Sequence, residues 1–138
     1  MRKLISLCLA ILMTISVIPA QAATKSFTAR GEQYTNSVEP DSKCAKSTDG
    51  DTYFYVTIKE VWSLHEDDRI YFGPRRAYDN GTYSGSLSSC LGYYLAKNPR
   101  QKAKYTKSAP GGVNYALNVK QTTAGPGNFF LLDVTWTP

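Results

Sequence analysis

The segment TYFYVTIKEVW, residues 52–62, decides the fold class. Apolar residues occupy every second position in it, at Phe54, Val56 and Ile58. The positions between them hold Tyr53, Tyr55, Thr57 and Lys59. A period of two carried by aromatic and β-branched residues is typical of a strand with one buried face. We therefore expect a half-buried β-strand over residues 52–62.

The same period returns twice toward the C-terminus. Apolar side chains alternate at Val113, Tyr115, Leu117 and Val119, and again at Phe130, Leu132, Val134 and Trp136. Between these runs, residues 122–128 contain Gly125-Pro126-Gly127, a turn cluster that cannot continue a strand. We expect two core strands that pair antiparallel as a hairpin. With the alternating residues 100–107 they would form a three-stranded meander.

Weaker indications fill the middle of the chain. Residues 69–72 and 92–97 are shorter strand candidates, and Asn80-Gly81 is a strong two-residue turn pair because both positions tolerate positive φ. A hairpin is expected between about residues 75 and 86. Short strands spaced by turns predict an all-β fold, a small sandwich or barrel of about seven short antiparallel strands.

The first 22 residues have the features of a secretory signal peptide. A cationic start, Met1-Arg2-Lys3, precedes an apolar run, and Pro19-Ala20-Gln21-Ala22 offers a small-x-small cleavage site. We expect cleavage after Ala22, which leaves residues 23–138 as a single secreted, extracellular β domain. No later apolar run approaches the ~20 residues needed to cross a bilayer, so no transmembrane segment is expected in the mature chain.

Two cysteines remain after the leader, Cys44 and Cys90. An even pair in an exported chain predicts one disulfide. Closing the loop between these two residues would stabilise the fold by roughly 4 kcal/mol in the chain-entropy model.

Charge is distributed unevenly along the mature chain. Residues 23–68 hold five cations and nine anions, whereas residues 69–138 hold nine cations and two anions, a net charge of +7. A clustered cationic surface on a secreted protein favours polyanions such as cell-wall polymers or anionic lipid headgroups. Export argues against nucleic acid as a partner, and the sequence does not indicate an oligomeric state.

The densest cationic segment suggests a binding surface. The period of two places Arg100, Lys102 and Lys104 on one face of a strand, as a track for a polyanion, with Tyr105 on the opposite face. Lys97 and Lys107 flank this row. The alternative is that these cations protect an exposed edge strand from aggregation.

Tyrosine offers a second kind of surface. The chain has 10 Tyr, 5 Phe and 2 Trp. Tyr53, Tyr55 and Tyr93 are candidates for stacking on sugars or on a partner protein. Cross-strand tyrosines that only stabilise a sheet explain the same composition.

The residue inventory offers little for catalysis. The single histidine lies in His65-Glu66-Asp67-Asp68, which we interpret as a solvated acidic loop, and Asp49-Gly50-Asp51 lacks the remaining spaced ligands of a calcium loop. No G-x-S-x-G nucleophile elbow and no phosphate-cradling glycine motif is present. We therefore expect no enzyme activity, no metal and no cofactor.

Several short segments resemble exported β-rich proteins of Gram-positive bacteria, some of them similar to bacteriocins of the lactococcin 972 type. The matching pieces are Tyr94-Leu95, residues 102–105, Tyr115-Ala116-Leu117 and the end of the chain from Val134 to Pro138. The resemblance covers about the last 50 residues. It implies an antibacterial or envelope-directed role, although this chain is longer than short bacteriocins and carries a cysteine pair.

Three classes of function follow from these features. The first is a secreted, non-enzymatic binding protein that acts at a bacterial envelope, with a bacteriocin-like effector as one form. The second is an extracellular carbohydrate-binding or adhesin-like module that uses exposed tyrosines. The third and least favoured is a small hydrolase that uses a carboxylate pair.

Overall fold

The computed structural model describes residues 22–32, 36–63, 69–88, 91–93, 100–121 and 129–138. Its regular structure is entirely β, which confirms the predicted fold class. The strands are β1 (Lys25–Glu32), β2 (Asn36–Ala45), β3 (Tyr53–Trp62), β4 (Ile70–Arg76), β5 (Leu91–Tyr93), β6 (Arg100–Lys104), β7 (Asn114–Gln121) and β8 (Phe129–Thr137).

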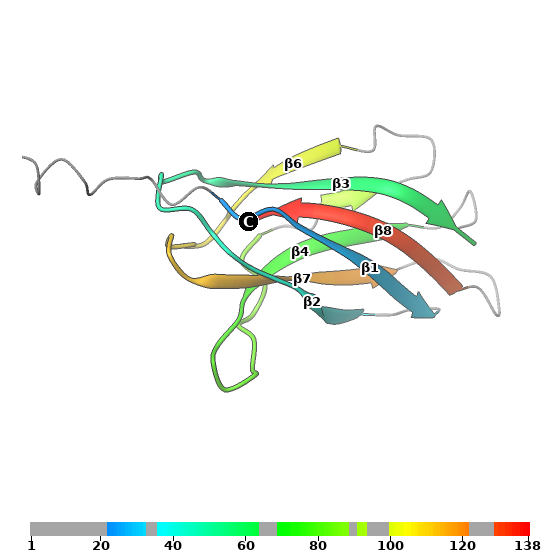
Figure 1. The fold of residues 1–138 in the computed structure, drawn as a ribbon, viewed down its shortest axis with the longest axis horizontal. Helices are drawn as coiled ribbons and strands as arrows, with labels where there is room; N and C mark the ends of the chain where they lie inside the picture. Colours follow the sequence, from blue (N-terminus) through cyan, green and yellow to red (C-terminus); the bar gives the residue numbers. More distant parts are fainter. Residues whose placement is uncertain (1–21, 33–35, 64–68, 89–90, 94–99, 122–128) are drawn as a thin grey trace, which may run out of the picture.

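Two antiparallel sheets of four strands stack face to face as a sandwich. Sheet A has the strand order β1-β8-β3-β6, and sheet B has the order β2-β7-β4-β5. Figure 1 shows the two layers, with β1 (blue) beside β8 (red) in one and β2 beside β7 in the other. The described residues contain no helix long and apolar enough to cross a membrane.

The predicted core is confirmed by burial. Tyr115, Leu117 and Val119 from β7 are fully buried, and the predicted apolar positions of β8 are at most 1% exposed. Val113 is partly buried and packs against this cluster. The core therefore consists of the inward faces of both sheets, as the period of two requires.

The predicted pairing of the last two strands is wrong. β7 pairs with β2 and β4 in sheet B, while β8 pairs with β1 and β3 in sheet A. The three-stranded meander is wrong for the same reason, because β6 pairs with β3. A turn cluster predicts that the chain reverses, but not which sheet receives the next strand. Gly125-Pro126-Gly127 itself lies outside the described residues.

The hairpin near Asn80 is confirmed, but its turn is longer than predicted. The Gly81 N–H donates to the Tyr78 carbonyl, the Tyr78 N–H donates to the Thr82 carbonyl, and Ala77 bridges Tyr83. Only Gly81 of the expected pair has a positive φ, at 81°. The Asn80 side chain instead accepts hydrogen bonds from the N–H and the hydroxyl of Thr82. This pattern is a three-residue loop that ends in a left-handed glycine.

A hydrogen-bonded serine ties the two sheets together inside the core. Ser42 lies in an irregular part of β2, where the register with β7 shifts. Its hydroxyl oxygen accepts a hydrogen bond from the Leu117 N–H at 2.7 Å, and its carbonyl accepts one from the Trp136 indole N–H at 2.7 Å. Trp136 belongs to sheet A, so this contact spans the sandwich.

Several predictions fall on residues that the structure does not describe. Cys44 is buried, and burial raises the pKa of its thiol to about 12. Cys90 lies outside the described residues, so the disulfide stays a prediction. The same holds for the leader up to residue 21, for Lys97, and for the acidic segment around His65.

Candidate functional site

The outer face of sheet A carries an unusual density of hydroxyl groups. Hydroxyl side chains of β8 face those of β1 and of the residue before it in pairs: Thr24 with Thr137 at 2.9 Å, and Ser26 with Thr135 at 3.1 Å. Thr28 extends the row by donating to the Asp133 carboxylate at 2.8 Å. The alternation that buries the apolar side chains of these strands necessarily turns these polar ones outward.

A β-bulge in β3 changes which side chains this face presents. Ile58 pairs with Val134 and Glu60 pairs with Asp133, so Lys59 is the extra residue. Lys59 and Glu60 are both exposed, and Val61 after them packs against the core. The bulge thus places an amine and a carboxylate side by side on the outer face, where bulges commonly redirect functional side chains.

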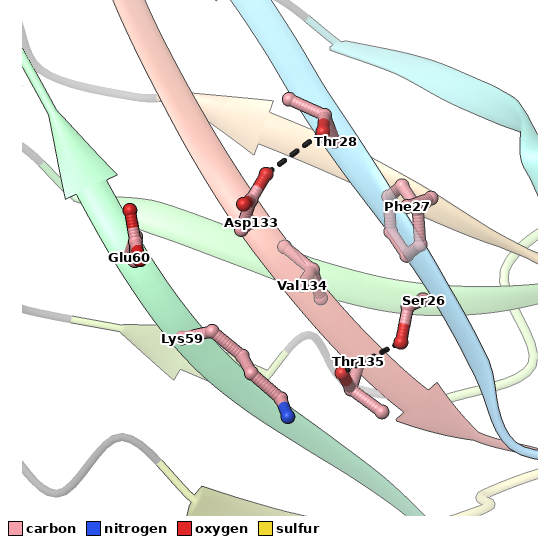
Figure 2. A pocket seen from close by; sticks show the side chains of 8 residues that line it. All are labelled: Ser26, Phe27, Thr28, Lys59, Glu60, Asp133, Val134 and Thr135. Atoms are coloured by element: carbon pink, nitrogen blue, oxygen red, sulfur yellow. Dashed lines mark hydrogen bonds between the residues drawn. The ribbon is translucent and has the colours of Figure 1, made fainter.

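Two shallow grooves follow the line between β8 and β3. One, of about 360 Å³, is lined by Ser26, Thr28, Lys59, Glu60, Asp133 and Thr135, together with parts of Phe27 and Val134. Figure 2 shows Lys59 and Glu60 on β3, with the Lys59 side chain extending toward β8, and the hydrogen-bonded pairs of β1 and β8 beside them. The second, of about 440 Å³, is lined by Thr24, Tyr55, Thr57, Lys59, Thr135 and Thr137. Because Lys59 and Thr135 line both, the grooves form one polar trough, which we call the sheet A trough.

The structure brings two predicted sets of residues onto this same face. β6 is the edge strand of sheet A, and its Lys102 and Lys104 are exposed. In the register with β3, Tyr55 is opposite Lys102 and Tyr53 is opposite Lys104. The Lys102 Nζ lies 5.1 Å from the centre of the Tyr53 ring, within the range of a cation–π contact.

The remaining predicted site residues divide between the two sheets. Arg100 begins β6, opposite Thr57, and Lys107 is exposed just beyond that strand. Tyr93 lies in β5, opposite Ile70 in sheet B, so it does not join the other tyrosines. Tyr105 is buried, as expected for the face opposite the cations, and desolvation raises the pKa of its hydroxyl.

The sequence patterns do not point to Lys59, Glu60, Asp133 and Thr135 as site residues. A usable indication exists in the 52–62 segment, because the apolar positions change from even to odd numbers between Ile58 and Val61. Such a change of phase within one strand predicts a bulge. Lys59 lies near Asp133 and Thr135 because β3 pairs with β8. The predicted hairpin placed β7 beside β8 instead.

Asp49-Gly50-Asp51 forms a turn, as interpreted from the sequence. Asp49 accepts hydrogen bonds from the Ser47 hydroxyl and the Asp51 N–H, and Asp51 accepts one from the Tyr53 N–H. The bond from Ser47 is the largest cause that lowers the pKa of Asp49. Within the described parts of the chain, no three His, Cys, Asp or Glu side chains cluster as metal ligands would.

Comparison with known proteins finds no relative of this chain. No family model matches the chain, and no curated protein and no solved structure matches it. The resemblance to bacteriocin-like proteins therefore stays a hypothesis, and function has to be inferred from the chemistry of the trough.

Proposed function

We propose that this protein is a secreted, non-enzymatic binding protein that holds a glycan polymer of a bacterial envelope on the outer face of sheet A. The observation that carries the proposal is the sheet A trough, in which hydroxyls, the Lys59 amine and the Asp133 carboxylate line two grooves that share Lys59 and Thr135. An open trough along the face of a sheet suits an extended chain better than a small enclosed ligand.

The polar groups of the trough match the chemistry of sugars. A sugar hydroxyl both donates and accepts, so it pairs with threonine and serine hydroxyls, with carboxylates that accept, and with amines that donate. Tyr55 lines the same depression and offers an aromatic ring beside these groups. Apolar surface together with a few placed polar groups is the usual composition of a ligand site.

The cationic edge beside the trough favours an anionic glycan. Lys102 and Lys104 are exposed on β6, next to Tyr55 and Tyr53 on β3. Phosphate or carboxylate groups on a cell-wall polymer would meet these amines while its sugars occupy the trough. Electrostatic attraction of this kind speeds association and weakens as salt is added.

A binding assay with purified cell walls tests the proposal. We would measure binding to walls that retain their anionic polymer and to walls from which it has been extracted. The parent should bind more tightly to the walls that retain the polymer, and on these walls the variant Lys59→Gln combined with Thr135→Val should lose about tenfold or more in affinity, which corresponds to about 1.4 kcal/mol. The matched control is Lys120→Gln, which removes an exposed lysine from β7 in the other sheet. Equal binding by the trough variant and the parent would refute the proposal.

A second candidate is binding to anionic lipid headgroups through the cationic row alone. Its support is the exposure of Lys102, Lys104 and Lys107 along one edge. Replacing Arg100, Lys102 and Lys104 with glutamine should then abolish binding to anionic vesicles at low salt, whereas the trough variant should bind them normally. If the triple variant binds vesicles as well as the parent does, the edge-protection explanation of these cations holds.

Secretion and effector activity belong to the same proposal and have their own tests. N-terminal sequencing of protein recovered from culture medium should begin at Ala23. A bacteriocin-like role should appear as growth inhibition of bacteria by the purified protein, and the trough variant should lose that inhibition together with wall binding.

A further inference from the structure

We propose that a second pocket, at the end of the sandwich where β2 and β6 leave their sheets, binds a small oxyanion such as a phosphate or carboxylate group. The pocket has a volume of about 280 Å³. Three segments form it: residues 46–52, the end of β6, and the loop 107–111. This inference does not depend on the sheet A trough.

Lys46 is the residue that indicates a ligand. Its side chain lines the pocket, the residue is only 2% exposed, and its Nζ has no hydrogen-bond partner. Its Nζ lies 5.1 Å from the centre of the Tyr105 ring, and its charge is one of the causes that lower the pKa of Asp49. Burying a cation without hydrogen-bonding partners costs free energy. A bound anion would provide the acceptor that this amine lacks.

Tyr105, which also lines the pocket, carries a second orphaned polar atom. Tyr105 is 7% exposed, and its hydroxyl also has no hydrogen-bond partner. Its ring is fixed by Phe54 and Tyr115, with centroid distances of 5.6 and 6.1 Å. Burial raises the pKa of this hydroxyl, which keeps it protonated and able to donate. An oxyanion would accept from both Lys46 and Tyr105.

The carboxylates of the neighbouring turn are engaged by other donors. Asp49 accepts from the Ser47 hydroxyl and from the Asp51 N–H. Asp51 lines the pocket, but its carboxylate accepts from the Tyr53 N–H. Lys104 and Lys107 also line the pocket and outweigh this one acidic residue. The charge balance of the lining therefore favours an anion.

Hydrogen bonds and close backbone packing fix the walls of this pocket. The Lys46 N–H donates to the Val113 carbonyl, and the Gly112 N–H donates back to the Lys46 carbonyl at 2.9 Å. Gly111 approaches the 46–52 segment so closely that a Cβ there would lie 2.2 Å from the Ser47 carbonyl oxygen. The Tyr115 hydroxyl holds the Pro110 carbonyl at 2.8 Å. The volume exceeds the roughly 30 Å³ share of one water several times over.

Calorimetric titration of the purified protein with inorganic phosphate, acetate and glycerol phosphodiester tests this inference. We expect saturable binding of at least one of them and a melting temperature that rises with its concentration. Binding of inorganic phosphate or acetate would indicate a free small anion, and binding of the phosphodiester alone would indicate a polymer. The proposal is overturned if none of the three binds saturably.

Variants locate the binding in this pocket. Lys46→Met keeps the aliphatic stem and removes the amine, so it should weaken binding at least tenfold, whereas Lys120→Met should not change it. Tyr105→Phe should weaken binding by several fold and keeps the ring contacts. If Lys46→Met does not fold, Tyr105→Phe and Lys107→Gln must each weaken binding. Unchanged affinity in these variants would mean that the anion binds elsewhere.

Discussion

β7 and β8 are each one of the two inner strands of their sheets, and they differ on the side that faces away from the core. Their inner faces are alike, because both are lined by fully buried large side chains. On the outer face of β7, Ala116 is 0% exposed and Asn118 is 6% exposed. On the outer face of β8, Thr135 and Asp133 are half-buried and line an open trough.

The difference shows that the outer face of β7 is buried at Ala116 and Asn118, whereas the outer face of β8 is partly accessible. In sheet B, Asn118 lies opposite Gly73 and donates its side-chain N–H to the Asn36 side chain at 3.0 Å. Because Asn118 is also only 6% exposed, it offers little to a ligand. In sheet A the β3 bulge opens the line between β3 and β8. We therefore expect side chains on the outer face of β7 to contribute to stability, and those on the outer face of β8 to contribute to binding.

The inner faces should give the largest effects. Trp136→Ala removes a side chain that is 1% exposed and its hydrogen bond to Ser42, so we expect a loss of about 3–5 kcal/mol. Trp62→Ala is the control, since Trp62 is 40% exposed and should cost much less. Urea unfolding measures both, and equal losses would contradict the assignment of Trp136 to the core.

The predicted disulfide, if it forms, should make the next largest contribution to stability. Cys90→Ser should lower the free energy of unfolding by roughly 2–5 kcal/mol if Cys90 is bonded to Cys44. Peptide mapping without reductant should recover the two cysteines in one linked peptide. Recovery of both cysteines as free thiols would show that no disulfide links β2 to the segment that precedes β5.

The loop that carries the chain from sheet A to sheet B should also be sensitive. Gly111→Ala places a Cβ against the Ser47 backbone, and overpacking of this kind costs about 1–3 kcal/mol. Gly85→Ala is the matched control, because a Cβ there meets nothing within 4 Å and its φ is not positive. Thermal unfolding should separate the two variants clearly, and similar melting temperatures would show that the loop yields.

The outer faces can be compared with one substitution made on each. Ala116→Val enlarges a fully buried position and should cost about 1–3 kcal/mol, with no change in wall binding. Thr135→Val keeps nearly the same shape and loses only the bond to Ser26, so it should cost about 1 kcal/mol or less and weaken wall binding. Weaker wall binding by Ala116→Val, together with unchanged wall binding by Thr135→Val, would contradict the roles that we assign to the two faces.

The smallest effect on stability should come from the cationic edge. Lys102→Gln combined with Lys104→Gln removes exposed charges, which should change the free energy of unfolding by under about 0.5 kcal/mol. Binding to an anionic polymer should fall at low salt and converge with that of the parent at high salt. A large stability loss would indicate that the contact between Lys102 and Tyr53 is structural.

By itself, the sequence determined the class of the fold and the orientation of side chains within each strand. Alternation is a local property, because neighbouring side chains of a strand point to opposite faces whatever the strand pairs with. The burial of Phe54, Val56 and Ile58, and of Leu132, Val134 and Trp136, therefore agrees with the prediction. The exposure of Lys102 and Lys104 follows from the same periodicity.

Only the tertiary structure decided which strands are neighbours. Pairing depends on contacts between residues that are distant in the sequence. By their alternation alone, β7 and β8 are both core strands, and either could belong to either sheet. That choice places Thr135 beside Lys59, brings Tyr55 opposite Lys102, and encloses Lys46 beneath the loop before β7. Both candidate sites join separate segments of the chain, so no local pattern specifies them.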